Sequence, residues 1–149
     1  MINKAIIKLD RQKILDFFKK SESKASVILK DKAKAGDTIK EALGKAVTNK
    51  SDLEGVWAKM LLLFAVAKDY VNGDYTEIPK RSIVAILGGL IYFLSPIDVV
   101  PDFIPVLGFI DDVFILNLVY KQVIKDLERY KIWKDSQLKI VGTIDESNA

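Results

Sequence analysis

The residues best suited to chemistry are four aspartates, Asp98, Asp102, Asp111 and Asp112, which are the only charged side chains in residues 82–120. Hard cations such as Mg²⁺, Mn²⁺ or Ca²⁺ prefer oxygen ligands, and an isolated carboxylate is costly in an apolar setting. One hypothesis is therefore that these four aspartates converge on a divalent cation. Their spacing does not match an EF-hand, because the D-x-[DN]-x-[DN]-G pattern and its closing Glu are absent.

The same segment also has a purely structural explanation. Ser95 followed by Pro96 predicts the start of a helical turn, which Pro101 then ends, and Gly108 can adopt a positive φ that reverses the chain. Side chains that cap such turns satisfy backbone N–H groups that would otherwise lack a partner. We favour this interpretation, in which the aspartates need no ligand. The motif residues are Ser95, Pro96, Asp98, Pro101, Asp102, Pro105, Gly108, Asp111 and Asp112.

The composition restricts catalysis. The chain has no His and no Cys, which excludes thiol nucleophiles, disulfides, the usual His/Cys zinc sites and the commonest general base near pH 7. No obvious base, nucleophile or substrate-binding Arg accompanies the aspartates. We therefore predict that the protein is not an enzyme and has no cofactor, unless the aspartates bind a divalent cation.

Two apolar segments must position the motif. Residues 82–94 are apolar around the whole circumference of a helix, which predicts burial in protein or in lipid. Thirteen helical residues span about 20 Å, less than the ~30 Å hydrocarbon layer, so a simple transmembrane helix is disfavoured. Ala85 and Gly89 are small residues at a spacing that lets two helices approach closely. Residues 111–134 begin acidic and end basic, in the order that the helix dipole favours, and predict the second flanking helix.

The segments before the motif also predict helices. Residues 1–20 predict a short basic helix that Asp10 caps. Residues 21–49 predict either one helix that is kinked near Gly36 or two short helices, the second of which restarts at Asp37 or Thr38.

Residues 51–71 give a clearer signal, because Ser51 and Glu54 match a capping box ahead of a wide apolar surface. This pattern predicts a helix from about residue 52 to 71. At the other end of the chain, residues 142–149 predict a loose tail.

The predicted fold class is all-α: a small helical bundle built around a unit of central helix, Pro/Asp-rich helical-turn hairpin and helix. A chain of 149 residues fits one compact domain. We expect a basic helical N-terminal region at 1–50, a helical core at 51–134 with the motif at 75–120, and a polar C-terminal tail at 135–149.

The charge distribution suggests a partner. Residues 1–50 hold 13 Lys/Arg and 6 Asp/Glu, whereas residues 51–149 hold 10 and 14. A basic amphipathic helix can lie on an anionic membrane surface, although Phe17 and Phe18 could equally pack on the core while the lysines are solvated, which we favour. The candidate cations are Lys4, Lys8, Arg11, Lys13, Lys19 and Lys20.

Nucleic acid is not the favoured partner, because the basic region lacks interleaved aromatic residues and any recognisable motif. A cleavable signal peptide is not predicted either, since Lys4, Lys8 and Asp10 precede any apolar stretch of sufficient length. We expect a location in the bacterial cytoplasm or at the cytoplasmic face of the membrane, and not secretion.

The segment that begins at Ile78-Pro-Lys-Arg and ends with Tyr92-Phe-Leu-Ser-Pro-Ile-Asp-Val-Val-Pro-Asp-Phe-Ile-Pro-Val-Leu-Gly-Phe-Ile-Asp-Asp112 resembles the YkvA-like domain of unknown function of bacterial proteins. The resemblance covers residues 75–120. It implies a small helical domain that is often suspected of membrane association and has no established activity. The matching positions are Ser95, Asp98, Pro101, Asp102, Pro105, Gly108, Asp111 and Asp112.

Together these patterns predict a non-enzymatic helical module, associated with a membrane or a membrane protein through the apolar hairpin 82–120. The mean hydropathy of +0.15 is high for a chain with 29% charged residues and points to a membrane or to an unusually apolar core. The alternative is a soluble helical domain that binds a divalent cation through the four aspartates. The sequence predicts neither the biological process nor the oligomeric state.

Overall fold

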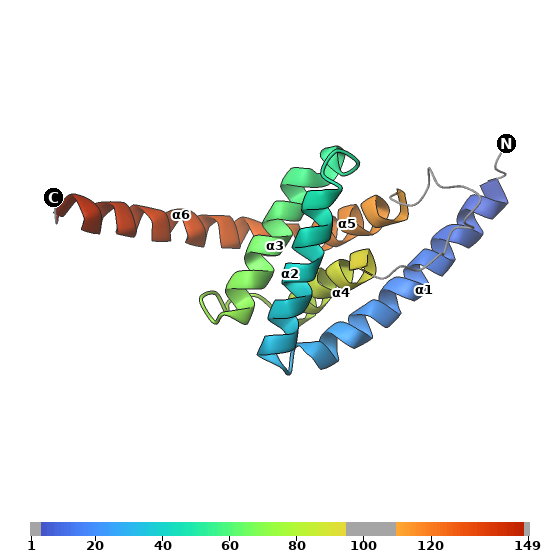
Figure 1. Ribbon diagram of the computed structural model, residues 1–149, viewed down its shortest axis with the longest axis horizontal. Helices are drawn as coiled ribbons and strands as arrows, with labels where there is room; N and C mark the ends of the chain where they lie inside the picture. Colours follow the sequence, from blue (N-terminus) through green and yellow to red (C-terminus); the bar gives the residue numbers. More distant parts are fainter. Residues whose placement is uncertain (1–3, 95–109, 148–149) are drawn as a thin grey trace.

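The computed structural model describes residues 4–94 and 110–147, with side chains described for 11–94 and 112–138. In these ranges six α-helices and one 3-10 turn form, and no strand occurs, which confirms the all-α bundle (Figure 1). The elements are α1 (Lys4–Ile28), α2 (Lys32–Thr48), η1 (Glu54–Val56), α3 (Trp57–Val71), α4 (Lys80–Leu94), α5 (Ile110–Gln122) and α6 (Ile124–Ser147). The predicted helical turns between residues 95 and 109 lie outside the described residues.

Helix α4 is the centre of the bundle. It packs against α1, α2, α3 and α5, and eleven of its fifteen residues are buried. The prediction that residues 82–94 are buried on all sides is therefore confirmed, and the surroundings of this helix are protein. Its side chains with at most 1% of their surface exposed are Ile83, Ile86, Leu87, Leu90 and Phe93.

Two glycines on α4 allow its neighbours to approach closely. A Cβ atom added at Gly88 would lie 2.9 Å from Cγ and 3.1 Å from Cα of Glu22 in α1. A Cβ atom added at Gly89 would lie 3.2 Å from Cγ2 of Val119 in α5. The expected role of Gly89 in close packing is thus confirmed, although the tighter contact is at Gly88, one residue earlier.

Helix α1 is longer than expected. It runs through Asp10 without interruption, so the prediction that this residue caps a short helix is wrong. The physical reason is local: residues 4–9 include the good helix formers Lys, Ala and Leu and contain no Gly or Pro, so the helix continues past Asp10 toward its N-terminus. A cap contributes only about 1 kcal/mol and does not stop it.

Residues 21–49 form parts of two separate helices, and the break lies before Gly36. The chain leaves α1 after Ile28, and Asp31 caps α2 by accepting hydrogen bonds from the N–H groups of Ala33 and Lys34 at 3.1 and 3.2 Å. Gly36 lies inside α2. Thr38 also lies inside α2 and so does not start a helix. Its hydroxyl donates to the Lys34 carbonyl, one turn earlier, at 2.8 Å.

Helix α3 starts later than the sequence predicted. It begins at Trp57 after the turn η1, and its N-cap residue, Val56, makes no side-chain hydrogen bond. The capping box at residues 51–54 therefore does not start the helix. Leu53 and Val56 are both buried, and the 3-10 turn places both against the core. The end at Val71 matches the prediction, and Gly73 follows with φ of +81°.

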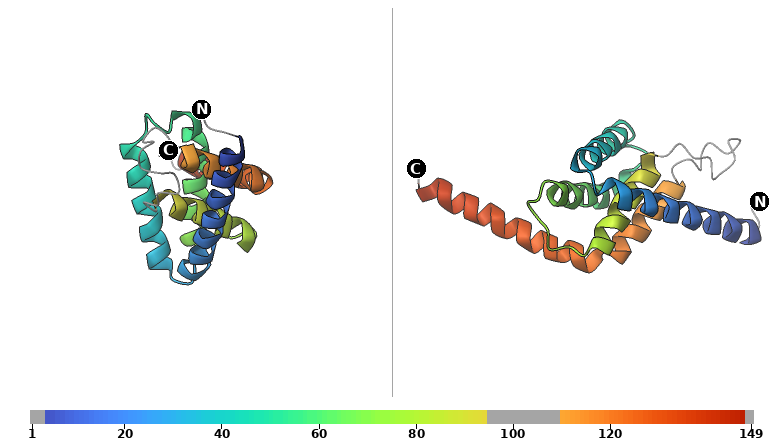
Figure 2. Two further views of the ribbon diagram at one scale, coloured as in Figure 1. Left: turned by 90° about the vertical axis from the view of Figure 1, so that its right-hand side faces the viewer. Right: turned by 90° about the horizontal axis from the view of Figure 1, so that it is seen from below.

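The second flanking helix is divided in two. It was predicted over residues 111–134, but α5 ends at Gln122 and α6 begins at Ile124. Backbone hydrogen bonds continue across the division, from Val123 to Val119 at 3.0 Å and from Leu127 to Val123 at 2.9 Å. Helix α6 then extends away from the bundle to Ser147, so the residues expected to form a loose tail are helical as far as that position (Figures 1 and 2).

The contact at Gly88 gives a direct test of the packing. Gly88→Ala should lower the free energy of unfolding by about 1–3 kcal/mol, because the new methyl group meets the backbone of Glu22 and the helices must separate. Gly44→Ala is the matched control, since its Cβ would meet no atom within 4 Å and Ala favours a helix by about 0.8–1 kcal/mol. Urea unfolding followed by circular dichroism measures both. Equal stability of the Gly88→Ala variant and the unmodified protein would contradict the tight crossing.

Candidate functional site at the motif end of the bundle

Helix α4 stops at Leu94 and α5 begins at Ile110. These two helix ends lie at the same end of the bundle, which we call the motif end (Figure 1). The N-terminal half of α1 runs past the same end (Figure 1). The Arg11 guanidinium carbon lies 5.8 Å from the centroid of the Phe114 ring, a cation–π distance. The basic start of α1 and the start of α5 are therefore neighbours.

The predicted membrane-facing cations all belong to α1. Residues 4, 8 and 11 have the spacing i, i+4, i+7 and therefore lie along one line of the helix, which we call the basic line. At Arg11 this line is in contact with α5. The side chains of Lys4 and Lys8 lie outside the described residues. The exposed cations of α1 among the predicted residues are Arg11, Lys13, Lys19 and Lys20.

The apolar residues of this segment pack on the bundle. Phe18 is buried, and Phe17 is partly buried against the core. The structural alternative, in which the two phenylalanines pack on the bundle, is thus confirmed. A membrane contact through α1 would consequently use its charged residues and not Phe18.

Lys45 contacts the end of α4. The Lys45 ammonium donates a hydrogen bond to the Phe93 carbonyl at 2.5 Å and lies 4.8 Å from the centroid of the Phe93 ring. The last carbonyls of a helix lack helical partners, so this contact satisfies one of them two residues before the motif begins. Lys50 lies 5.2 Å from the ring centroid of Trp57, at the start of α3.

The structure tests the four aspartates only in part. Asp98 and Asp102, and the side chain of Asp111, lie outside the described residues. Asp112 is buried in the first turn of α5, where the helix dipole stabilises a carboxylate, and it makes an interaction there. Among the described residues no group of three or more Asp, Glu, His or Cys could hold a metal ion. The cation hypothesis, which needs Asp98 and Asp102, stays a prediction.

A buried polar contact that the sequence analysis missed connects α3 and α6. Asp69 is buried, and its Oδ2 accepts hydrogen bonds from the Tyr130 hydroxyl at 2.6 Å and the Lys134 ammonium at 3.2 Å. Burial and the neighbouring Asp69 raise the pKa of Tyr130 above its ordinary value of 10.0. Tyr75 and Trp133 pack on the Tyr130 ring with centroids 5.2 and 5.9 Å away. The available signal was a carboxylate on an otherwise apolar helix face.

A second polar cluster lies where α1, α4 and α6 meet. Ser82 is buried, and its hydroxyl donates to Oδ2 of Asp126 at 2.5 Å. A cavity of about 410 Å³ beside this bond is also lined by Glu22 and Arg81. Partial burial raises the pKa of Glu22 above its ordinary value of 4.5, while Lys19 lowers it by a smaller amount. The residues come from distant segments, so no local pattern predicted them.

Comparison with known proteins identifies the class of this helical domain. Residues 82–118 match the family described as Protein of unknown function (DUF1232). The chain is also similar to the uncharacterized membrane protein YkvA of Bacillus subtilis (strain 168), with 29% identity over 103 residues, which cover 69% of this chain and 97% of that protein. The chain therefore carries a YkvA-like domain of unknown function, as its motif indicated.

A more distant similarity involves a much longer protein. The E3 ubiquitin-protein ligase RNF170 of Xenopus laevis is 35% identical over 62 residues, which cover 36% of this chain and 24% of that protein. The chain thus spans about a quarter of this relative. No solved structure matches the chain. Within its described residues, none of the helices has both the length and the apolar character that a membrane crossing needs.

The environment of Glu22 predicts a pH dependence. The raised pKa means that the native state binds the proton of this carboxyl more tightly than the unfolded chain does. The stability that this proton provides is complete below the ordinary pKa of 4.5 and is lost as pH rises through the raised pKa. Glu22→Gln should therefore raise the melting temperature at pH 7 and change it little at pH 4.

Thermal melts at both pH values, followed by circular dichroism, measure this difference. Glu41→Gln is the control, because Glu41 is an exposed residue of α2. It should change the melting temperature by a similar small amount at both pH values. A Glu22→Gln variant that is no more stable than the unmodified protein at pH 7 would show that burial of this carboxylate has no cost.

Proposed function

We propose that the protein is a non-enzymatic helical module that attaches to the anionic cytoplasmic face of a membrane through the motif end of the bundle. The observation that carries this proposal is the contact of Arg11 with Phe114, which sets the basic line of α1 beside the start of α5. The relative from Bacillus subtilis is named as a membrane protein, which supports a membrane role for this chain.

The packing of α4 decides between insertion and surface attachment. Insertion of the hairpin 82–120 would require α4 to leave the bundle. Its fully buried side chains, among them Ile86, Leu90 and Phe93, each contribute about 1.5–3 kcal/mol of burial free energy. Contact with lipid would recover part of this burial free energy. The remaining helices of the bundle, however, would expose their own apolar faces to water. Surface attachment leaves the core intact and is therefore the mode we propose.

The charges at the motif end are sufficient for such attachment. A Lys or Arg close to an anionic membrane contributes about 1 kcal/mol at physiological ionic strength. The basic line of α1 supplies three positions, at residues 4, 8 and 11, and Lys13 is an exposed neighbour. Their sum gives weak, reversible binding that salt screens, because the Debye length falls from ~10 Å at 0.1 M to ~3 Å at 1 M.

Vesicle binding tests the proposal directly. The double variant Lys8→Gln/Arg11→Gln should bind vesicles of phosphatidylglycerol and phosphatidylcholine about 30-fold more weakly, because it loses two charges worth about 1 kcal/mol each. The control Lys24→Gln/Lys40→Gln removes the same charge from exposed positions away from the basic line and should bind almost as the unmodified protein does. Co-sedimentation at 0.1 and 1 M salt provides the measurement.

Several results would overturn this proposal. Equal losses in both double variants would mean that net charge alone attracts the protein to the vesicles. Binding that persists at 1 M salt would indicate insertion in place of electrostatic attachment. Binding to native membranes but not to protein-free vesicles would assign the attachment to a membrane protein.

A further inference from the structure

Residues 135–147 of α6, which we call the distal segment, lie beyond the bundle. Figures 1 and 2 show this segment with no other described element beside it. At a rise of 1.5 Å per residue it is about 20 Å long. Just before it, α6 is still held to the bundle, because Trp133 packs on Tyr75 with ring centroids 4.9 Å apart and Lys134 pairs with Asp69.

The composition of the distal segment does not favour a helix that stands alone. Residues 140–144 are Ile-Val-Gly-Thr-Ile, and both Gly and β-branched residues have low helix propensity. An isolated helix of this length is marginal in water even when its composition is favourable. Helix α6 nevertheless continues as far as Ser147. Most helical stability in proteins comes from packing of an apolar face, which indicates a partner for this segment.

The apolar residues of the distal segment lie on one half of the helix. At about 100° per residue, they fall on the half that also carries Leu127, Tyr130 and Trp133. Leu127 and Tyr130 are buried, whereas Leu138 keeps 63% of its surface exposed. The face that packs on the bundle thus continues along the distal segment. Its apolar residues there are Leu138, Ile140, Val141 and Ile144.

The opposite half of the distal segment is polar, so the segment is amphipathic. The side chains of residues 139–147 lie outside the described residues, and their positions on the helix follow from its register. The residues of the polar half are Asp135, Ser136, Lys139, Gly142, Thr143, Glu146 and Ser147.

The charges along α6 favour a second copy of the same helix as the partner. Residues 129–134 hold three cations and no carboxylate, whereas residues 145–147 hold Asp145 and Glu146 and no cation. Carboxylates in the last turn oppose the helix dipole, and residues 140–147 contain no Lys or Arg that could pair with them. An antiparallel copy of α6 would bring its basic segment to this acidic end. A parallel copy would place the two acidic ends together.

Lys134 and Asp145 indicate how two antiparallel helices would align. They are eleven positions apart, about three turns, and therefore lie on the same flank of the apolar half. In a twofold-symmetric pair each contact occurs twice, so an axis near residue 140 sets Lys134 of each copy opposite Asp145 of the other.

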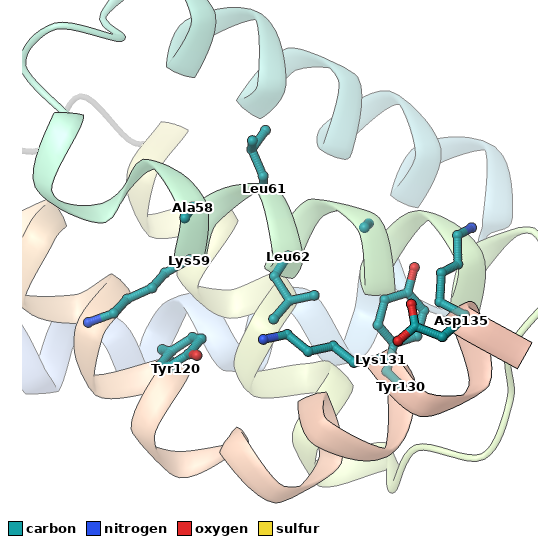
Figure 3. Close-up of a pocket in the computed structure, with 10 residues that line it drawn as sticks. Ala58, Lys59, Leu61, Leu62, Tyr120, Tyr130, Lys131 and Asp135 are labelled. Atoms are coloured by element: carbon teal, nitrogen blue, oxygen red, sulfur yellow. The ribbon is translucent and has the colours of Figure 1, made fainter. Parts of the chain in front are cut away.

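The side chain of Lys134 is accessible for this contact. It lines a groove of about 430 Å³ beside α3 and stays 47% exposed although it pairs with Asp69. Figure 3 shows this part of α6, with Tyr130, Lys131 and Asp135 labelled. Asp135 belongs to the polar half of the helix, so the flank that would receive Asp145 is basic at this point.

We propose that the distal segment joins two copies of this chain through an antiparallel α6–α6 contact centred near residue 140. The apolar half of each distal segment covers that of the other copy, and Lys134–Asp145 pairs lie at both ends of the contact. Figure 1 shows the distal segment on the side of the bundle away from the motif end, so pairing leaves the motif end of each copy free. The proposal goes beyond membrane attachment and does not depend on it.

Sedimentation equilibrium of the full chain at micromolar concentrations tests the proposal. The expected mass is twice the chain mass of 16.7 kDa. Ile140→Lys/Ile144→Lys should weaken the dimer by at least about tenfold, because it places unpaired charges in the apolar contact. Thr143→Lys/Ser147→Lys is the matched control, since it adds the same charge at the same spacing on the polar half and should dimerise as the unmodified protein does. Circular dichroism verifies that each variant is folded.

The direction of the two helices is tested by their charges. Asp145→Asn/Glu146→Gln should weaken an antiparallel dimer by about fivefold, because both Lys134–Asp145 pairs are lost. The same variant should strengthen a parallel dimer by removing the repulsion between the acidic ends. An unchanged or stronger dimer would therefore overturn the antiparallel arrangement.

Single cysteines provide a second test, because the chain has none of its own. Val141→Cys lies beside the proposed axis and should form a disulfide-linked dimer on oxidation. Gln137→Cys lies on the same half of the helix but should not, because its two copies would be about 9 Å apart along the helix axis, beyond the ~7 Å that a disulfide spans between Cα atoms. Equal cross-linking of both variants would indicate a parallel pair and overturn the proposal.

Other results would overturn the proposal as a whole. One is a protein that is monomeric throughout the micromolar range, and another is a dimer that Ile140→Lys/Ile144→Lys leaves unchanged. A monomer whose binding to vesicles of phosphatidylglycerol and phosphatidylcholine is lost in Ile140→Lys/Ile144→Lys, but not in Thr143→Lys/Ser147→Lys, would assign the apolar half to lipid instead.

Discussion

The close crossing of α1 over α4 at Gly88 is the contact on which the rest of the bundle depends. Because Gly88 has no Cβ, the backbone of Glu22 can come within the space that a side chain would occupy. That approach buries Ala25 of α1 and completes the enclosure of α4. On another face of α4, Gly89 admits Val119 of α5. The helices that carry the two ends of the motif, α4 and α5, are therefore positioned by close contacts at glycines.

The sequence predicted the features that depend on burial of apolar side chains. It did not predict where the helices start, because capping signals were given too much weight. Residues 82–94 have no polar face, so a helix enclosed by other groups was the only arrangement compatible with their composition. The capping signals at Asp10 and at Ser51 failed, because a cap contributes only about 1 kcal/mol. Burial of Leu53 and Val56 contributes more and moved the start of α3 to Trp57.

The polar clusters could not be read from local patterns because their members are far apart along the chain. Asp69 bonds to Tyr130, 61 residues later, and Ser82 bonds to Asp126, 44 residues later. Only the position of Asp69 on an apolar helix face carried a signal, since a buried carboxylate requires a donor. The motif itself was recognised because its residues are contiguous.

Membrane attachment and cation binding place related demands on the motif. Ionised and solvated aspartates in the motif would reduce the attraction of the protein for an anionic surface, because their charge opposes that of the lysines. Aspartates that cap helical turns would keep their negative charge, because backbone N–H groups are neutral donors. A bound divalent cation would instead cancel two of these negative charges. A cation would therefore strengthen attachment at the motif end, so the two functions would be cooperative and not exclusive.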